Sequence, residues 1–110
     1  MAPKSNWYMS KRWLATRKRI LMRDGYMCRV ASRYGRREPA TLVHHIFPRD
    51  EYPQYQYCDW NLISVSRGTH NQLHDRDTND LSGEGIKLLV RTARKNNIPI
   101  PEKYAKVPLW

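Results

Sequence analysis

The fold can be predicted from three segments: Val43-His44-His45-Ile46-Phe47-Pro48, Asn61-Leu62-Ile63-Ser64-Val65 and His70-Asn71-Gln72-Leu73-His74. Residues 41–47 form a run of β-branched, apolar and histidine residues that predicts a strand ending at Pro48. Residues 62–65 predict a second short strand, and residues 69–76 a helix with Ser66 as a candidate N-cap. The connection at 48–60 is long enough to suggest a functional loop.

Two longer helices are predicted to flank this centre. Residues 11–23 form the first, because Trp13, Leu14, Ile20 and Leu21 recur at a spacing of seven, and Gly25 suits the left-handed position after it. Residues 84–95 form the second, with Ile86, Leu89, Val90 and Ala93 along one side. Residues 1–9 are expected to be a loose lead-in, residues 29–40 a basic loop, and the tail extended and packed through Tyr104 or Trp110.

Length and charge limit the class of protein. The 110 residues suffice for one small domain, 1–110. Twenty Lys and Arg against ten Asp and Glu give a net charge of +10, which favours a nucleic-acid partner over a merely solvated basic surface. The sequence has no apolar run of membrane-spanning length and no signal-like N-terminus, so a cytoplasmic protein without a membrane partner is expected.

The four histidines of the chain all lie in the central unit. Neighbours in a strand point to opposite faces, so His44 and His45 are not expected to bind one metal together. Residues four apart on a helix share a face, so His70 and His74 can bind one ion. With one histidine of the first pair they make three ligands and leave open positions, as in catalytic metal sites. The remaining imidazole suits a general base.

These residues resemble the HNH (ββα-metal) nuclease family. The similarity begins at Asp24-Gly25-Tyr26-Met27-Cys28, and its histidine and asparagine steps are sixteen residues from His45 to Asn61, nine to His70 and four to His74. It implies an α+β fold with a ββα-metal (His-Me finger) core at about 41–77. The helices at 11–23 and 84–95 would pack around that core.

The resemblance also implies roles. His44, His70 and His74 would bind one divalent ion (Zn²⁺, Ni²⁺, Co²⁺, Mn²⁺ or Mg²⁺), with Asp75 and Asp77 as outer partners. His45 would be the general base and Asn61 would orient it, giving a DNA endonuclease that leaves 5′-phosphate and 3′-hydroxyl ends. Small relatives of this kind occur in phages, some beside DNA-packaging proteins such as terminase and portal. The candidate contacts to the DNA backbone are Arg33, Arg36, Arg37, Arg49 and Arg67.

One departure from the family concerns a structural zinc. Many relatives carry two Cys-x-x-Cys pairs, which here correspond to Cys28 with Ala31 and Ser66 with Thr69. A four-cysteine zinc site is therefore excluded, and Cys28 is expected to be a buried free thiol. Packing of Trp13, Leu14 and Ile20 is expected to hold the first helix in its place.

Two other functions compete with the nuclease. One is a non-catalytic nucleic-acid-binding module in which the metal only holds the fold. The other is an accessory protein that acts through a protein partner, with Tyr52, Tyr55, Tyr57 and the tail as its interface. His45 discriminates, because a scaffold needs no spare imidazole beside its metal.

Overall fold

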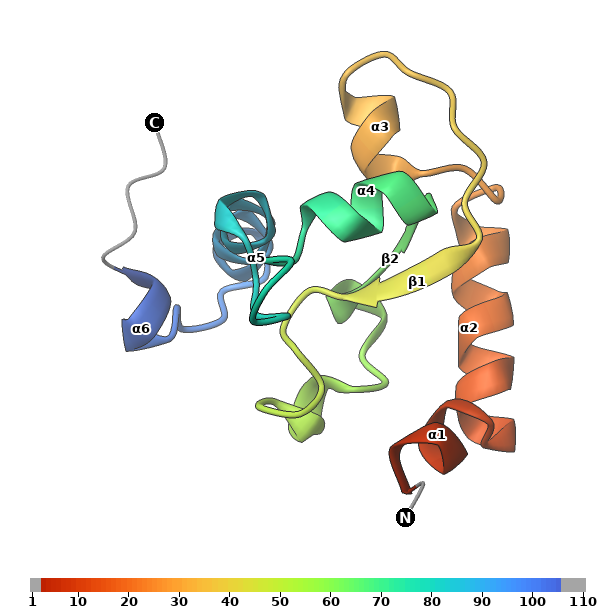
Figure 1. Ribbon diagram of the computed structural model, residues 1–110, viewed down its shortest axis with the longest axis horizontal. Helices are drawn as coiled ribbons and strands as arrows, with labels where there is room; N and C mark the ends of the chain where they lie inside the picture. Colours follow the sequence, from red (N-terminus) through yellow and green to blue (C-terminus); the bar gives the residue numbers. More distant parts are fainter. Residues whose placement is uncertain (1–2, 106–110) are drawn as a thin grey trace.

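The computed structural model describes residues 3–105 (Figure 1). Its helices and strands are α1 (Pro3–Tyr8), α2 (Lys11–Arg23), α3 (Arg29–Arg33), β1 (Leu42–His45), β2 (Leu62–Val65), α4 (Arg67–Gln72), α5 (Gly83–Lys95) and α6 (Glu102–Ala105). Two short 3₁₀ turns, η1 (Pro53–Tyr55) and η2 (Asp59–Asn61), lie in the long connection between the strands. None of the helices in this part of the chain is long and apolar enough to cross a membrane.

The centre of the fold is an antiparallel β1–β2 hairpin with a helix on each face. Its register pairs Leu42 with Val65 and His45 with Leu62. Leu62 packs against Trp13 and Ile20 of α2, whereas His44 faces α4 through its contact with His70. This arrangement confirms the predicted α+β fold with a ββα core and helices around it, since α5 adds buried residues to the same apolar core as β2 and Leu73, which follows α4.

Helix α2 follows its predicted bounds because both ends are capped. The Ser10 hydroxyl accepts a hydrogen bond from the Trp13 amide, and Gly25 takes the left-handed φ of +64° just past the end. Trp13, Ile20 and Leu21 are buried as expected, but the expectation for Leu14 is wrong, because its side chain is 43% exposed. The hairpin covers the stripe of Trp13, Thr16 and Ile20, one position away from Leu14.

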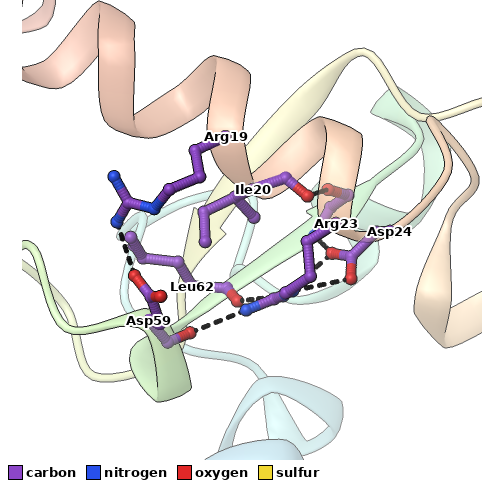
Figure 2. A network of polar contacts seen from close by, with 7 residues as sticks. Arg19, Ile20, Arg23, Asp24, Asp59 and Leu62 are labelled. Atoms are coloured by element: carbon purple, nitrogen blue, oxygen red, sulfur yellow. Dashed lines mark hydrogen bonds and ion pairs between the residues drawn. The ribbon is translucent and has the colours of Figure 1, made fainter.

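Polar contacts at the end of α2 supply the attachment that Leu14 does not (Figure 2). The Arg23 guanidinium donates to the carbonyls of Asp59 and Leu62 at 2.9 and 2.8 Å. The Asp24 carboxylate accepts from the Ser64 amide at 3.1 Å, and Arg19 pairs with the Asp59 carboxylate. Helix α2 is thus bonded both to β2 and to the turn that precedes it.

Helix α5 begins one residue before its predicted start and approaches the end of α4 closely. The Ser82 hydroxyl caps it by accepting from the Gly85 amide. A Cβ at Gly85 would lie 2.3 Å from the Leu73 carbonyl oxygen, so this position requires glycine. Past α5 the expected extended tail is wrong, since α6 forms there and buries Tyr104. Trp110 lies outside the described residues.

Two segments expected to be irregular contain helices. The lead-in holds α1, whose Trp7 packs on Trp13 and Tyr57 at ring-centroid distances of 5.0 and 5.5 Å. The basic loop holds α3, where the Cys28 thiol accepts from the Ala31 amide. Helices this short do not form on propensity alone, so tertiary contacts stabilise them.

Candidate metal centre and its cleft

His44 lies at the centre of a three-histidine cluster. Its side chain is 1% exposed, and its Nε2 is buried without a hydrogen-bond partner. His70 comes from α4, and its ring centroid is 5.5 Å from that of His44. One potential ligand atom from each of His44, His70 and His74 lies within 4.8 Å of the other two. The structure thus brings together the three histidines predicted as ligands.

His74 reaches the cluster from outside the helix. Helix α4 ends at Gln72, two residues earlier than His74, which bridges to Leu81 instead. The Nδ1 of His74 lies 3.2 Å from the Asn79 carbonyl oxygen. A carbonyl only accepts, so Nδ1 must carry the proton, and Nε2 is left with a free lone pair. The shared helix face expected for His70 and His74 is therefore wrong, although both rings reach the same point.

A tight turn holds the Asn79 carbonyl in place. The Asp75 carboxylate accepts hydrogen bonds from the amides of Asp77 and Thr78, and these bonds lower the pKa of the Asp75 carboxyl. Asn79 itself adopts a left-handed φ of +63°. In the described residues Asp75 therefore acts on the turn, and the backbone, not an outer carboxylate, contacts the histidine.

The cluster favours neutral imidazoles. Burial, followed by the neighbouring His74 and His70, holds the pKa of His44 well below its usual value. Burial also lowers the pKa of His70, with smaller contributions from His74 and Arg67. Neutral imidazole is the form that binds metal. A buried, unpartnered Nε2 beside two further imidazoles is costly without a ligand and fits a divalent transition-metal ion.

His45 lies on the other face of the hairpin, as the alternation of a strand predicts. Its Nε2 lies 3.1 Å from the Gln56 carbonyl oxygen, so Nε2 carries the proton and Nδ1 has the free lone pair. The ring stacks on Trp13 at 5.0 Å and contacts Trp7 at 5.7 Å. Burial lowers the pKa of His45 to about 4, and the charge of Arg49 acts in the same direction. His45 is therefore neutral at pH 7 and able to accept a proton at Nδ1.

Asn61 connects β2 to the long loop. Its Oδ1 accepts from the Phe47 amide at 2.6 Å, and its Nδ2 donates to the carbonyls of Phe47 and Tyr55 at 3.2 Å each. Tyr55 precedes Gln56, whose carbonyl holds His45. Asn61 thus contacts the loop that orients His45 and lies apart from the three-histidine cluster.

One cleft of about 600 Å³ is lined by all four histidines. Of the five predicted DNA-contacting arginines, Arg49 lines this cleft beside His45, and Arg67 is close enough to His70 to lower its pKa. Arg33 and Arg36 line a different hollow, and Arg37 lines neither. The five arginines predicted to contact DNA therefore do not lie on one surface in the structure.

Aromatic residues beside this cleft were not predicted from the sequence. The Arg49 guanidinium lies 4.2 Å from the Trp7 ring and 5.0 Å from the Tyr8 ring, and its Nε is buried without a hydrogen-bond partner. Two adjacent aromatic residues in a segment expected to be loose were the signal that could have revealed them. Tyr52 and Tyr55, which the accessory-protein alternative places at an interface, pack inward on Phe47.

Comparison with solved structures finds a protein of similar fold. No protein-family model matches the chain, and no curated protein was found to match it in sequence. Among solved structures, the chain is similar to the HNH endonuclease of the deep-sea thermophilic bacteriophage GVE2, determined with a manganese ion. The two are 28% identical with a TM-score of 0.60, over 62% of this chain and 74% of that one. The chain shares the fold of that HNH endonuclease.

Proposed function

We propose that this protein is a metal-dependent DNA endonuclease that hydrolyses phosphodiester bonds. One observation carries the proposal: a three-histidine cluster and a separate neutral imidazole with a defined free nitrogen line the same cleft. A metal scaffold needs only the first of these groups. The similarity to an HNH endonuclease and the net charge of +10 support DNA as the substrate.

His44, His70 and His74 would hold the divalent ion. Bound there, it would neutralise charge on the scissile phosphate and on the departing 3′ oxygen. The donor set of three imidazoles favours Mn²⁺, Zn²⁺, Co²⁺ or Ni²⁺ over Mg²⁺, and the Mn²⁺ of the similar structure supports the first of these.

His45 acts as the general base. Its Nδ1 takes a proton from water, the water oxygen forms a bond to phosphorus, and the bond from phosphorus to the 3′ oxygen breaks; the 3′ oxygen takes up a proton from solvent. The products are a 5′-phosphate and a 3′-hydroxyl. The Gln56 carbonyl orients the ring by accepting from its Nε2, and Asn61 holds the loop that carries this carbonyl.

Arg49 and Arg67 bind phosphate beside the reacting group. Stacking on Trp7 and Tyr8 fixes the Arg49 guanidinium at the cleft wall, so little side-chain entropy remains to be lost on binding. Arg67 opens α4 three residues before His70. A role beside phage packaging proteins such as terminase or portal rests on the resemblance, and the phage source of the similar protein supports it.

The test is cleavage of supercoiled plasmid with a panel of divalent ions. Wild-type protein should nick or linearise plasmid only with metal, and EDTA should stop the reaction. His45→Ala should bind DNA and metal but lose most of the cleavage, about 100-fold or more for a general base. The matched control, Gln54→Ala, changes an exposed residue of the same loop and should cut normally. Binding without cleavage under every ion would favour the non-catalytic module instead.

A further inference from the structure

A second hollow in the molecule is larger than the histidine cleft. It measures about 1150 Å³ and lies between α3, α5 and β2, on the flank of α4 formed by Thr69, Gln72 and Leu73. His70 and His74 line the other hollow, and no residue lines both. In Figure 1, α3 and α5 flank α4. We call this second hollow the α3–α5 groove.

Two rows of cations, one from α3 and one from α5, line the α3–α5 groove. Arg29 and Arg33 are four residues apart on α3, and Lys87, Arg91 and Lys95 recur every four residues on α5. Residues four apart share a helix face and are separated by about 6 Å along its axis. Within each helix, the cations that line the groove therefore recur at a regular interval.

The acidic residues of the groove do not neutralise these rows. Each acid already has a partner: Asp24 pairs with Arg23, Asp59 with Arg19, Glu38 with Arg36, and Glu84 with Lys87. Within residues 3–105, Arg29, Arg33, Arg91 and Lys95 have no ion pair, and all four are exposed. Four uncompensated charges thus line one concave surface.

We propose that the α3–α5 groove binds the phosphodiester backbone of a nucleic acid, at a site separate from the histidine cleft. A ligand with negative charges at a regular interval suits cations that recur every turn, and guanidinium groups bind phosphate in a fork geometry. Tyr34 is 60% exposed on the groove wall, and Trp60 lies on its floor, which provides aromatic surface for a base or sugar. Duplex and single-stranded DNA share this backbone chemistry.

This inference goes beyond the proposed cleavage reaction and does not depend on it. Arg33 and Arg36, two of the predicted contacts to the DNA backbone, line this groove and not the histidine cleft. The protein then holds nucleic acid on both flanks of α4, and binding at the groove anchors it while the cleft is empty. Steep salt dependence follows, because each phosphate contact releases counterions.

The test measures binding of short labelled duplex and single-stranded DNA in EDTA, so that cleavage cannot intervene. The groove variant carries Arg33→Gln, Arg91→Gln and Lys95→Gln. The control variant carries Lys11→Gln, Lys18→Gln and Arg94→Gln, three exposed cations that line neither hollow. Both lose three charges, so any difference reports position and not net charge.

For duplex DNA, the slope of log K against log salt should become shallower by about 2.7 in the groove variant, and by less than about 1 in the control. For single strands the expected change is about 2; the larger loss of affinity identifies the preferred form. Equal slopes in the two variants would overturn the proposal, as would binding of a polyglutamate peptide in preference to both DNAs. If the triple variant melts early, Arg91→Gln with Lys95→Gln replaces it, with a change of about 1.8 for duplex. A wild-type protein that binds but never cuts would defeat the cleavage proposal alone.

Discussion

Replacing Asn61 by Ala removes two atoms that satisfy three backbone groups. The Asn61 side chain is fully buried, and its partners are the Phe47 amide and the carbonyls of Phe47 and Tyr55. The Tyr55 carbonyl keeps its bond from the Cys58 amide, so two groups, the Phe47 amide and carbonyl, lose their partner. At about 1–3 kcal/mol for each, Asn61→Ala should lower the free energy of unfolding by about 2–6 kcal/mol. A small domain has about 5–15 kcal/mol in total, and the variant should still fold at low temperature.

The same substitution should also reduce cleavage. Without the bond to Tyr55, the loop keeps only its own backbone bonds, so the Gln56 carbonyl is held less firmly against His45 and the ring is less well oriented. Changes of this kind behind a catalytic group typically cost about 10–100-fold in activity. Urea unfolding followed by circular dichroism gives the stability, and plasmid cleavage at a temperature where the variant is folded gives kcat.

The control is Asn6→Ala, which changes an exposed asparagine of α1 and should shift stability by less than about 0.5 kcal/mol. The reasoning fails if Asn61→Ala unfolds within 1 kcal/mol of wild type. It also fails if the stability falls as expected but the folded variant cuts at the wild-type rate, because the loop would then not act on His45.

Three further predictions concern pH, metal and burial. Burial alone would raise the pKa of the Asp24 carboxyl, but hydrogen bonds from Arg23 and Ser64 lower it overall, so its ionised form stabilises the fold above about pH 4 and this stabilisation fades as pH falls. Asp24→Asn should therefore cost about 2 kcal/mol in urea unfolding at neutral pH and much less near pH 3; an equal cost at both would contradict the assignment. Added Mn²⁺ or Zn²⁺ should raise the Tm of the wild-type protein. At a metal concentration a hundredfold above Kd, the free energy of unfolding should increase by about 2.7 kcal/mol. His44→Ala should abolish that rise and Asp77→Ala should retain it; a rise that survives His44→Ala places the metal elsewhere. Trp7→Ala should raise the pKa of His45 from about 4 toward its usual value, because burial is the main cause of the shift; an NMR titration of the ring that shows no change would remove Trp7 from that role.

The elements that could be predicted from sequence are those with a regular apolar pattern. α2 and β2 match their predicted bounds, and α5 differs by one residue at its start. α1 has six residues and no such pattern. It depends on contacts of Trp7 with Trp13 of α2 and with Tyr57 of the connection between the strands. Long-range contacts of this kind leave no periodic trace in a sequence.

The candidate site divides in the same way. The spacing of His44, His70 and His74 in the sequence predicted that they lie together, and in the structure they form one cluster. The groups that fix their neighbours' tautomers are the carbonyls of Gln56 and Asn79, and every residue has a carbonyl, so sequence could not single these out. Charge has the same weakness, since a basic composition does not say which face an arginine joins.

Cys28, Ala31, Ser66 and Thr69, the positions compared above with a four-cysteine zinc site, lie close together and form a different attachment. The Cys28 thiol is buried, which by itself raises its pKa, and hydrogen bonds from Thr69 and the backbones of Ala31 and Ser66 lower it overall. The Ser66 hydroxyl donates to Glu38 and also caps α4 by accepting from the Thr69 amide. α3 and α4 are therefore joined through neutral hydrogen bonds and one carboxylate, while Arg23 and Asp24 tie α2 to β2. Because Ala31, Ser66 and Thr69 provide no thiolates for a zinc site, a chelator should leave these helices joined. In this chain, the effect of EDTA on activity can therefore be measured separately from an effect on folding.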